Sequence, residues 1–508
     1  MTENKKEIKN IENRIRCQSL LDKVVKADEA VWLIEDGMTI ATSGFTPSGY
    51  PKAVPLALAR RKEDEGLDIK VNLMTGASVG DELDGAWARA GLIDKRLPYQ
   101  TNESLRKHTN DGKCNYLDMH LSHVPNYTKL GFLGAIDVAI VEALAITEEG
   151  SIIPTTSVGA TPTYVDMAEK VIIEINTAQP LQLEGMHDIY MPQKPPLKAP
   201  IPIFKTEDRI GEISIPCHPD KIAAIVYSDI QDNVRPLSQV DETSQKISNN
   251  LIEFLRNEVR TGRLDHTLLP IQSGVGSVAN AVLSGLNHSE FHDLVCYTEV
   301  IQDSMLDLLD SGKVSVASGT SITPSETGLK RFQDNIDFYR EKIILRPQEI
   351  SNHPEVIRRL GVIAINTAIE VDIYGNVNST NIMGSRMMNG IGGSGDFTRN
   401  GSISIFTTPS VAKGGDISAV VPMVSHCDHT EHDVMVIITD QGVADLRGLS
   451  PKERAWVIIE NCAHPDYKKD LHAYFNKAKD GRFKHTPHII GQALSWHDRY
   501  MKTGSMKG

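Results

Sequence analysis

TSGFTPSGYPKAVPLAL (residues 42–58) and QSGVGSVANAVLSGL (residues 272–286) share one pattern: a strand end, Ser-Gly, a glycine turn and an apolar helix. A second pair, DVAIVEALAITEEGSIIPTTSVG (137–159) and VIAINTAIEVDIYGNVNSTNIMG (362–384), repeats the correspondence at a spacing of 225 residues instead of 230. In that pair Gly150 falls opposite Gly375, and Gly159 falls opposite Gly384. The repetition predicts two similar domains in tandem, residues 1–225 and 226–508, divided within the polar, turn-rich segment 205–240.

Short runs rich in valine and isoleucine alternate with helical patterns along the whole chain. The runs are VNLM (71–74), DVAIVEAL (137–144), KVIIEI (170–175), KIAAIV (221–226), GVIAIN (361–366), SISIF (402–406) and VMVIIT (434–439). Strands that are buried on both faces of a parallel sheet have this composition. Residues 242–260 predict a helix with Ile247, Leu251, Phe254, Leu255 and Val259 on one face. We therefore predict an α/β protein with two open, mostly parallel sheets.

The composition narrows the class of protein. Its 508 residues are 40% hydrophobic and 23% charged, as in ordinary globular proteins, and the net charge of −13 argues against a nucleic-acid partner. The six cysteines form no CxxC pair, which is typical of reduced thiols in the cytoplasm. The start of the chain, MTENKKEIKNIENRIR, lacks the apolar core of a signal peptide. No window reaches the roughly 18 consecutive apolar residues of a membrane span. We expect a cytoplasmic protein without a membrane partner.

The segment LVCYTEVIQD (294–303) carries Glu299 to the carboxyl end of a predicted strand. The repeat aligns Thr298-Glu299 with Thr75-Gly76, at a spacing of 223 residues. Ligands of open α/β sheets bind beyond the carboxyl ends of the strands, and an ionised glutamate can act as a nucleophile without an activating base. Alternatively, Glu299 caps a helix that begins at Val300, or pairs with a buried cation. The pattern alone leaves these alternatives open.

Two glycine-rich segments are candidates for holding a ligand. QSGVGS (272–277) precedes a predicted helix, so its backbone N–H groups suit an anion or a developing oxyanion. In GIGGSGDF (390–397) we expect the glycines to let the backbone approach a ligand closely. We do not interpret GIGGSGDF as a dinucleotide fingerprint, because the strand SISIF is expected to follow where a helix should open. Two tight turns without a ligand are the alternative.

Three further motifs are less specific. GASVG (76–80) follows a predicted strand and fits a nucleophile elbow, which would make Ser78 a nucleophile. HCDHTEH (426–432) offers His426, Asp428, His429 and His432 as metal ligands, but without a companion cluster an ordinary polar segment is favoured. Lys413, beside two glycines, would suit a phosphate-rich ligand and can equally be a solvated lysine.

Together these segments resemble the class I coenzyme A transferases of the acetyl-CoA hydrolase/transferase family. The likeness extends over nearly the whole chain and is greatest to bacterial succinyl-CoA transferases and succinyl-CoA:acetate CoA-transferases. The matching blocks are GFTPSGYPK (44–52), TGAS (75–78), HLSH (120–123), EALAIT (142–147), LLPIQSGVGSVANAV (268–282), YTEVIQD (297–303), IILRPQEISN (343–352), DIYGNVNST (372–380), MMNGIGGSGDF (387–397) and DLRGLSP (445–451).

The resemblance implies a CoA transferase in which Glu299 is the nucleophile. CoA would move between succinyl-CoA and a short-chain carboxylate such as acetate, through an acyl-glutamyl anhydride and a glutamyl-CoA thioester. The thioester is conserved throughout, so the resemblance implies no cofactor and no metal, with coenzyme A as a substrate. The implied partners are acyl-CoA and small carboxylates, and family members are commonly homodimers.

The resemblance also implies roles for individual residues. The backbone N–H groups of Val275 and Gly393 would form the oxyanion hole. The implied CoA-binding residues are Gly274, Val275, Gly276, Ser277, Val278, Asn389, Gly393 and Lys413. Ser78, Thr101 and Asn352 match positions that handle the carboxylate substrate, which disfavours Ser78 as a nucleophile. Asp440, in TDQG, stands where relatives have glutamate, one methylene longer, so Asp440 is left out of the catalytic set.

Two rival functions remain at this stage. An acyl-CoA hydrolase of the same family would let water take the place of the acceptor carboxylate. A non-catalytic CoA-binding protein would be expected to have lost Glu299, which is present here together with both glycine-rich segments.

Overall fold

The computed structural model describes residues 13–233 and 240–508. Two expectations lie partly outside them: the absence of a signal peptide concerns residues 1–12, and the predicted divide includes 234–239. The chain forms two compact units, each assembled from several segments. The first unit contains Met1–Pro236, Tyr297–Leu306 and Val316–Val356, and the second contains Leu237–Cys296, Asp307–Ser315 and Ile357–Gly508. These discontinuous units do not test the division after residue 225, which stays a prediction.

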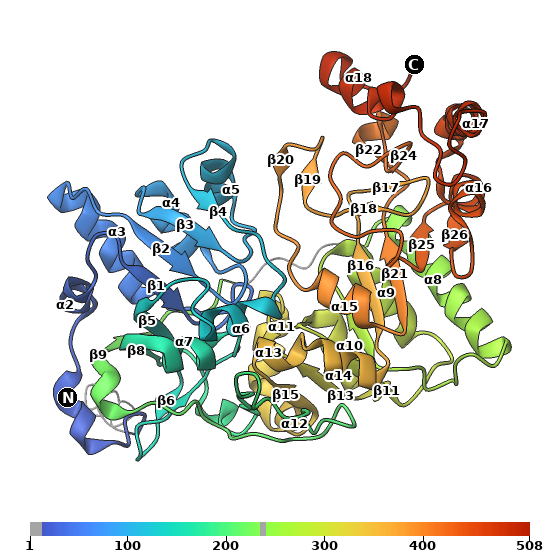
Figure 1. Ribbon diagram of the computed structural model, residues 1–508. Coiled ribbons are helices and arrows are strands. Elements are labelled where there is room, and N and C mark those ends of the chain that lie inside the picture. Colours follow the sequence, from blue (N-terminus) through green and yellow to red (C-terminus); the bar gives the residue numbers. More distant parts are fainter. Residues whose placement is uncertain (1–12, 234–239) are drawn as a thin grey trace. The chain divides into compact units, whose positions relative to one another are not determined.

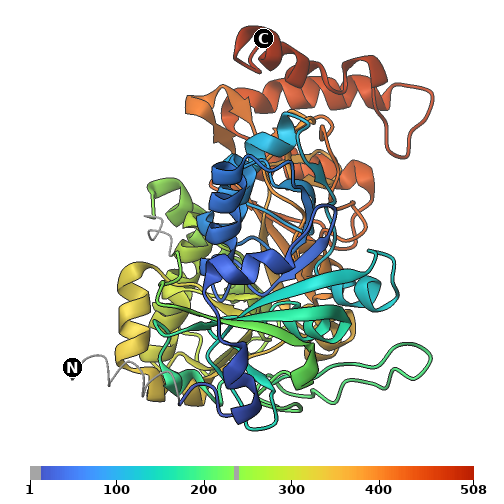
Figure 2. The same ribbon diagram turned by 90° about the vertical axis from the view of Figure 1, so that its left-hand side faces the viewer.

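A seven-stranded sheet is built from the first part of the chain, in the order β4-β3-β2-β1-β5-β8-β9 (Figure 1). All of its neighbouring strands pair in parallel. The strands are β1 Thr39–Thr42, β2 Val71–Met74, β3 Ile93–Leu97, β4 Asn115–Tyr116, β5 Ile136–Ala143, β8 Ala168–Asn176 and β9 Ile222–Ser228. The long strands β5 and β8 lie side by side, with β9 next to them (Figure 2).

A second sheet has eight strands in the order β15-β13-β11-β10-β16-β21-β25-β26. Strand β10 pairs in parallel with both β11 and β16, and β26 runs antiparallel to its neighbour, β25. The strands are β10 Ile271–Ser273, β11 Leu294–Tyr297, β13 Val314–Gly319, β15 Ile343–Leu345, β16 Ile363–Thr367, β21 Ile403–Thr407, β25 Val436–Thr439 and β26 Gly442–Asp445.

The two sheets repeat one strand order, which confirms the predicted α/β class and the duplication. Taken in sheet order, β4, β3, β2, β1, β5, β8 and β9 correspond to β15, β13, β11, β10, β16, β21 and β25, and β26 is an addition. The strands β5 and β16 are each followed by an antiparallel hairpin, β6 (Ala145–Ile146) with β7 (Ile152–Ile153) and β17 (Glu370–Asp372) with β18 (Val377–Asn378). Gly150 and Gly375 turn these hairpins with φ of 91° and 93°, a conformation that favours glycine.

Helices flank the sheets and bury their apolar faces. The main ones in chain order are α2 Ala27–Ala30, α3 Ala53–Glu65, α4 Ala86–Arg89, α5 Glu103–Asn110, α6 His123–Lys129, α7 Thr161–Met167, α8 Glu242–Arg260, α9 Ser277–Asn287, α10 Asp303–Asp310, α11 Glu326–Asp334, α12 Ile336–Lys342, α13 Gln348–Ser351, α14 Pro354–Leu360, α15 Ser394–Asn400, α16 Pro451–Cys462, α17 Pro465–Lys479 and α18 Ser495–Thr503. In the first unit α3 packs Val54 and Leu58 into a core with Ile40 and Ile140 of the sheet. Helix α8 has the predicted bounds and buries the predicted face, except that Val259 is half-buried.

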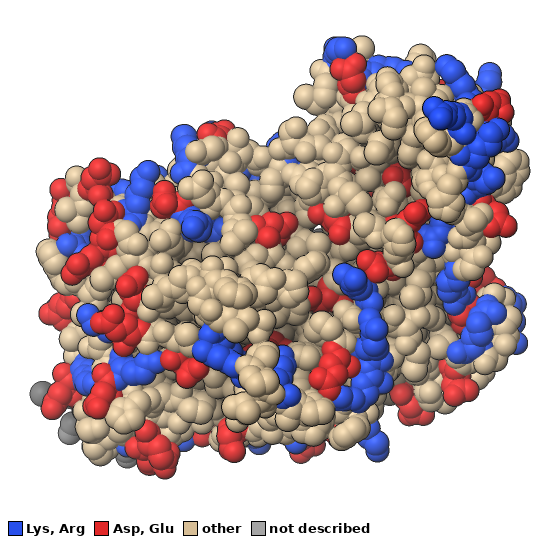
Figure 3. Space-filling view, viewed as in Figure 1, with Lys and Arg blue, Asp and Glu red and all other residues tan. Residues whose placement is uncertain are grey.

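Basic and acidic side chains are interspersed over the face seen in Figure 3. The net charge of −13 is therefore not gathered into one acidic field on that face. Within residues 13–233 and 240–508, no helix is both long and apolar enough to cross a membrane.

Candidate active site

Glu299 lies just beyond the carboxyl end of β11 and is half-buried. The next two residues form the short strand β12 (Val300–Ile301), and helix α10 begins only at Asp303. The alternative in which Glu299 caps a helix starting at Val300 is therefore wrong. The Glu299 carbonyl accepts hydrogen bonds from the backbone N–H groups of Thr320 (2.8 Å) and Ser321 (3.1 Å). The backbone at Glu299 is thus held by the segment that leads into β14 (Ser321–Ile322).

Asn352 binds the carboxylate of Glu299. Its Nδ2 donates a hydrogen bond of 2.7 Å to Glu299 Oε1, and its side chain is fully buried. The amide is held in turn, because Ser351 Oγ donates to Asn352 Oδ1 at 2.9 Å. Asn352 ends α13, whose first residue, Gln348, donates its backbone N–H to Gly159 O at 2.9 Å. This buried donor fixes the orientation of the Glu299 carboxylate.

The position equivalent to Glu299 in the first sheet cannot carry a side chain. Gly76 follows β2 as Glu299 follows β11, and a Cβ on Gly76 would lie 2.5 Å from Gly44 O and 2.9 Å from Gln348 Oε1. Backbone atoms cannot give way cheaply, so this strand end requires glycine. The steric difference explains why only one copy of the repeat carries a carboxylate.

The segments that carry Ser78 and Thr101 come together with the Glu299 segment in the first unit. Ser78 is buried and Thr101 is half-buried. Their neighbours share one small apolar cluster, formed by Phe45, Ala77, Leu121, Val300 and the partly buried Tyr99. Gln348 Nε2 also donates to Leu121 O at 3.0 Å, which ties α13 to this cluster.

The glycine-rich segments lie in the second unit. Gly276 precedes α9 with a φ of 111°, as expected for a glycine turn before a helix. SISIF forms the predicted strand, β21, but the expectation that no helix opens at GIGGSGDF is wrong, because α15 begins at Ser394, directly after Gly393. Among the described residues, the backbone N–H groups of Val275 and Gly393 donate to no other group. Both are thus available to a ligand.

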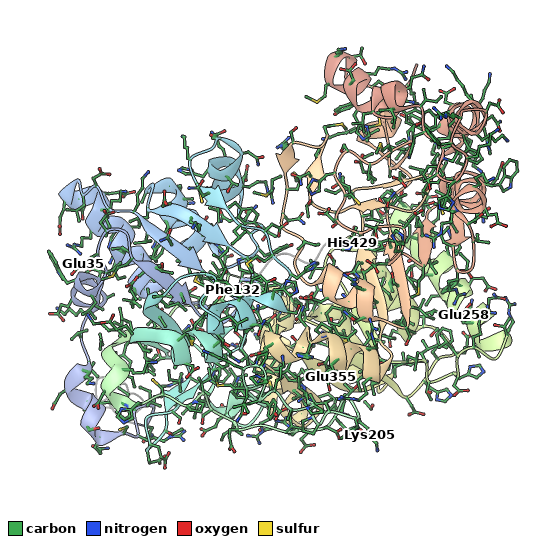
Figure 4. All side chains as sticks on the ribbon, in the orientation of Figure 1. Glu35, Phe132, Lys205, Glu258, Glu355 and His429 are labelled. Carbon is green, nitrogen blue, oxygen red and sulfur yellow. The ribbon has the colours of Figure 1, made fainter. Side chains whose placement is uncertain are left out.

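The HCDHTEH segment fastens the loop that carries Asn389 and Gly393. Asp428 accepts hydrogen bonds from Ser379 N (2.6 Å) and Thr380 Oγ1 (2.9 Å). His429, labelled in Figure 4, lies 3.1 Å from Ser394 Oγ through its Nε2. Within the described ranges, no three His, Cys, Asp or Glu side chains are arranged to hold a metal ion.

Asn389 and Lys413, the remaining predicted CoA contacts, also belong to the second unit. Asn389 Nδ2 donates to Ser379 O (3.2 Å) and Gly390 O (2.9 Å), so it braces the glycine-rich loop. Lys413 is exposed and has a left-handed backbone with a φ of 52°. In the part of the chain that the structure describes, its ammonium group has no hydrogen bond or ion pair. An unpaired exposed cation remains free for an anionic ligand.

Asp440 has a local structural role. Its carboxylate accepts hydrogen bonds from Ser410 N (2.6 Å) and Ser410 Oγ (3.0 Å), and Gln441 Nε2 donates to it at 2.7 Å. The shorter side chain is thus held against the start of the loop that carries Lys413.

The residues that hold Glu299 in place were not predicted from the sequence. Thr320 and Ser321 lie in SGTSIT, a segment of small polar residues with no functional signature. The resemblance to a family did not point to them either, since both contact Glu299 through backbone groups.

Comparison with known proteins gives the relationships of the chain. The acetyl-CoA hydrolase/transferase N-terminal domain model matches residues 8–227, and the corresponding C-terminal domain model matches residues 328–475. The chain is 60% identical over 496 residues to the succinyl-CoA:acetate CoA-transferase of Clostridium kluyveri, covering 98% of this chain and 92% of the relative. It is 45% identical to the acetyl-CoA hydrolase of Saccharomyces cerevisiae, covering 98% of this chain and 97% of the relative.

Two solved structures share the fold. RipA from Yersinia pestis superimposes with a TM-score of 0.69 at 22% identity, covering 90% of this chain and 97% of that one. The 4-hydroxybutyrate CoA-transferase of Porphyromonas gingivalis has a TM-score of 0.60 at 20% identity, covering 90% and 98%. With both domain models matched in order and 60% identity to a curated relative, this chain belongs to the acetyl-CoA hydrolase/transferase family.

Proposed function

We propose that this protein is a CoA transferase that moves CoA between succinyl-CoA and a short-chain carboxylate such as acetate, with Glu299 as the nucleophile. The observation that carries the proposal is the carboxylate of Glu299 at a strand end, with a buried amide donor on one oxygen. The family membership and the 60% identity to a succinyl-CoA:acetate CoA-transferase support the same assignment.

In the proposed reaction a carboxylate oxygen of Glu299 attacks the thioester carbonyl of the acyl-CoA. The C–S bond breaks, leaving an acyl-glutamyl anhydride and the CoA thiolate. The thiolate then attacks the glutamyl carbonyl of the anhydride, which releases the acyl group as a carboxylate and leaves a glutamyl-CoA thioester. An incoming carboxylate reverses both steps and departs as the new acyl-CoA. No proton is gained or lost, and the energy of the thioester is retained without a cofactor or a metal.

The N–H groups of Val275 and Gly393 are proposed to bind the oxyanion that develops on the carbonyl under attack. Each oxyanion donor of this kind contributes about 2.7–4 kcal/mol in the transition state.

The remaining proposed roles concern the two substrates. Lys413 is proposed to bind CoA phosphates, and Asn389 is proposed to shape the CoA site. The segment Gly274–Val278, which leads into α9, is proposed to contact the rest of the CoA molecule. Ser78, Thr101 and Asn352 are proposed to admit the carboxylate. A cytoplasmic location is proposed from the cysteine pattern. A homodimer is proposed because members of the family are commonly homodimers.

The acyl-CoA hydrolase named among the relatives is the alternative function. A transferase must keep water from the glutamyl-CoA thioester while it admits a carboxylate. Initial rates with succinyl-CoA and acetyl-CoA as donors, and with acetate, succinate or no acceptor, separate the two. We expect fast exchange with a carboxylate and slow release of free CoA without one.

Two outcomes of this panel decide the assignment. Thr101→Val should weaken the use of the acceptor carboxylate more than the binding of acyl-CoA, because it removes a hydroxyl proposed to contact the acceptor. If free CoA accumulates from acetyl-CoA as fast without a carboxylate as with one, the transferase assignment is wrong and the hydrolase assignment stands.

A further inference from the structure

Glu299 and Asn352 reach each other from two separate segments, so their geometry depends on what fixes those segments. Glu299 is held through its carbonyl by the backbone of Thr320 and Ser321. Asn352 is held at the end of α13 and donates its own N–H to Gln348 O at 3.0 Å. The bond of 2.7 Å between Asn352 Nδ2 and Glu299 Oε1 therefore requires a fixed distance between the Thr320 segment and α13.

Gly159 bridges the two segments. Its N–H donates to Thr320 Oγ1 at 3.0 Å, and its carbonyl accepts the N–H of Gln348, the first residue of α13, at 2.9 Å. Thr320 also accepts the N–H of Val158 on its carbonyl at 2.9 Å. One residue thus connects the support of the nucleophile to the support of its amide partner.

The bridge has little freedom to move. Gly159 has a left-handed φ of 54°, and a Cβ there would lie 3.1 Å from Gly44 O. Thr320 is fully buried, so bulk water does not reach this position to replace its hydroxyl as the acceptor for Gly159 N–H. A second connection exists, from Arg346 N to Gly319 O at 2.8 Å, but it joins backbone to backbone and does not include Gly159.

We infer that Thr320 is a positioning residue: its hydroxyl, through Gly159, sets the geometry between Glu299 and Asn352. The inference rests on the proposed function, in which Glu299 is the nucleophile. Thr320 does not touch the reacting atoms, and its effect is exerted on the orientation of the carboxylate before it attacks the thioester. Orientation acts on the chemical step, so kcat should respond and the binding of acyl-CoA should not.

The test compares variants that differ by one hydroxyl. Thr320→Val keeps the shape and removes the acceptor, whereas Thr320→Ser keeps the acceptor. We expect Thr320→Val to lower kcat by about 10–100-fold, because small misplacements of reacting groups have effects of that size, with the KM for acyl-CoA nearly unchanged. Thr320→Ser should restore kcat to near the wild-type value. The Arg346 connection is the reason why a partial loss is expected instead of a complete one.

Thr147→Val is the matched control. Thr147 Oγ1 also accepts a backbone N–H, from Ser151 at 3.2 Å, but within the turn between β6 and β7. Its replacement should leave kcat and KM as in the wild type. If Thr320→Val does not fold, Thr320→Ala and Thr320→Ser form a second pair that differs by the same hydroxyl, and Thr320→Ala should be the slower of the two.

A single-turnover measurement on the wild-type protein distinguishes failure of this inference from failure of the proposed function. Formation of a CoA adduct from acyl-CoA is followed by intact-protein mass in a single turnover. If the wild type forms no adduct, the proposed function fails, whatever Thr320 does. If the wild type forms it and the variants without the hydroxyl form it equally fast, or if Thr320→Ser fails to rescue them, Thr320 is not a positioning residue.

Discussion

His187 should make the folded protein less stable as the pH falls from about 7.5 to 5. The side chain is buried, and its Nε2 lies 2.8 Å from Thr155 O, in the loop that leads to Gly159. Burial lowers the pKa of His187 from 6.5 to about 4, against the smaller opposing effect of the Thr155 hydrogen bond. Because the unfolded chain then binds the proton more readily than the folded one, the stabilisation is complete above the unfolded pKa and is lost as the pH falls toward the folded pKa.

The size of the effect follows from the two pKa values. With 6.5 in the unfolded chain and about 4 in the folded chain, the linkage relation gives a loss of about 2 kcal/mol in the free energy of unfolding at pH 5. His187→Gln keeps a donor for Thr155 O and removes the titration, so the variant should lack this part of the pH dependence. Other groups titrate equally in both proteins and cancel in the difference.

Urea unfolding of the wild type and of His187→Gln at the two pH values measures the effect. Trp87, fully buried in the same unit, supplies a fluorescence signal. The wild type should lose about 2 kcal/mol more than the variant between the two pH values. Parallel pH dependence in the two proteins would refute the argument, because it would mean that His187 is protonated as easily in the folded state as in the unfolded one.

Two further predictions concern lysines. Lys52→Met should lower the free energy of unfolding in urea by about 3–5 kcal/mol. The substitution leaves the carboxylates of Glu142 and Asp232, which lie 2.5 Å and 3.0 Å from Lys52 Nζ, buried without their cation. A loss no larger than that caused by replacing the exposed Lys246 would contradict this prediction. Lys413→Ala should raise the KM for acyl-CoA more than it lowers kcat, because it removes an interaction made equally in the ground state and the transition state. Unchanged steady-state kinetics would mean that Lys413 is a solvated lysine without a role in CoA binding.

The strands and the duplication could be predicted because their signals are local or repeated. Runs such as VNLM and KVIIEI are apolar on both faces and mark buried parallel strands wherever they occur. The pairs Gly150/Gly375 and Gly159/Gly384 revealed the repeat in the sequence. All four residues have a positive φ, which few residues other than glycine tolerate, so glycine occurs at the same place in both copies. The helix α8 was predictable from its 3.6-residue apolar period.

The helix α15 could not be predicted, for a physical reason. Its sequence, SGDFTRN, contains glycine, serine, aspartate and asparagine, which have low intrinsic helix propensity, and it lacks an apolar period. Tertiary contacts support it instead, such as the one between His429 and Ser394 at its start. Such contacts are invisible in a single sequence.

The position of Glu299 at a strand end was predictable, and the contacts that support it were not. Its place after a strand and the glycine in the other copy marked Glu299 as a candidate, and the family resemblance implied its role as the nucleophile. The reason for that glycine, the close approach of Gly44 O to Gly76, appears only in three dimensions. The bridge from the Thr320 hydroxyl through Gly159 to the backbone of Gln348 joins residues that lie far apart in the chain. A single sequence does not show that these residues are in contact.

The central claim is that Glu299 carries CoA covalently during the reaction. The most direct measurement is mass spectrometry of the protein after incubation with acyl-CoA alone, followed by digestion and mapping of the modified peptide. We expect a CoA-sized addition on the peptide that contains Glu299, discharged by added acetate or succinate, and no addition in a folded Glu299→Ala variant, which should also lack transfer activity. A CoA adduct on another residue, or transfer at nearly the wild-type rate in Glu299→Ala, would contradict the account.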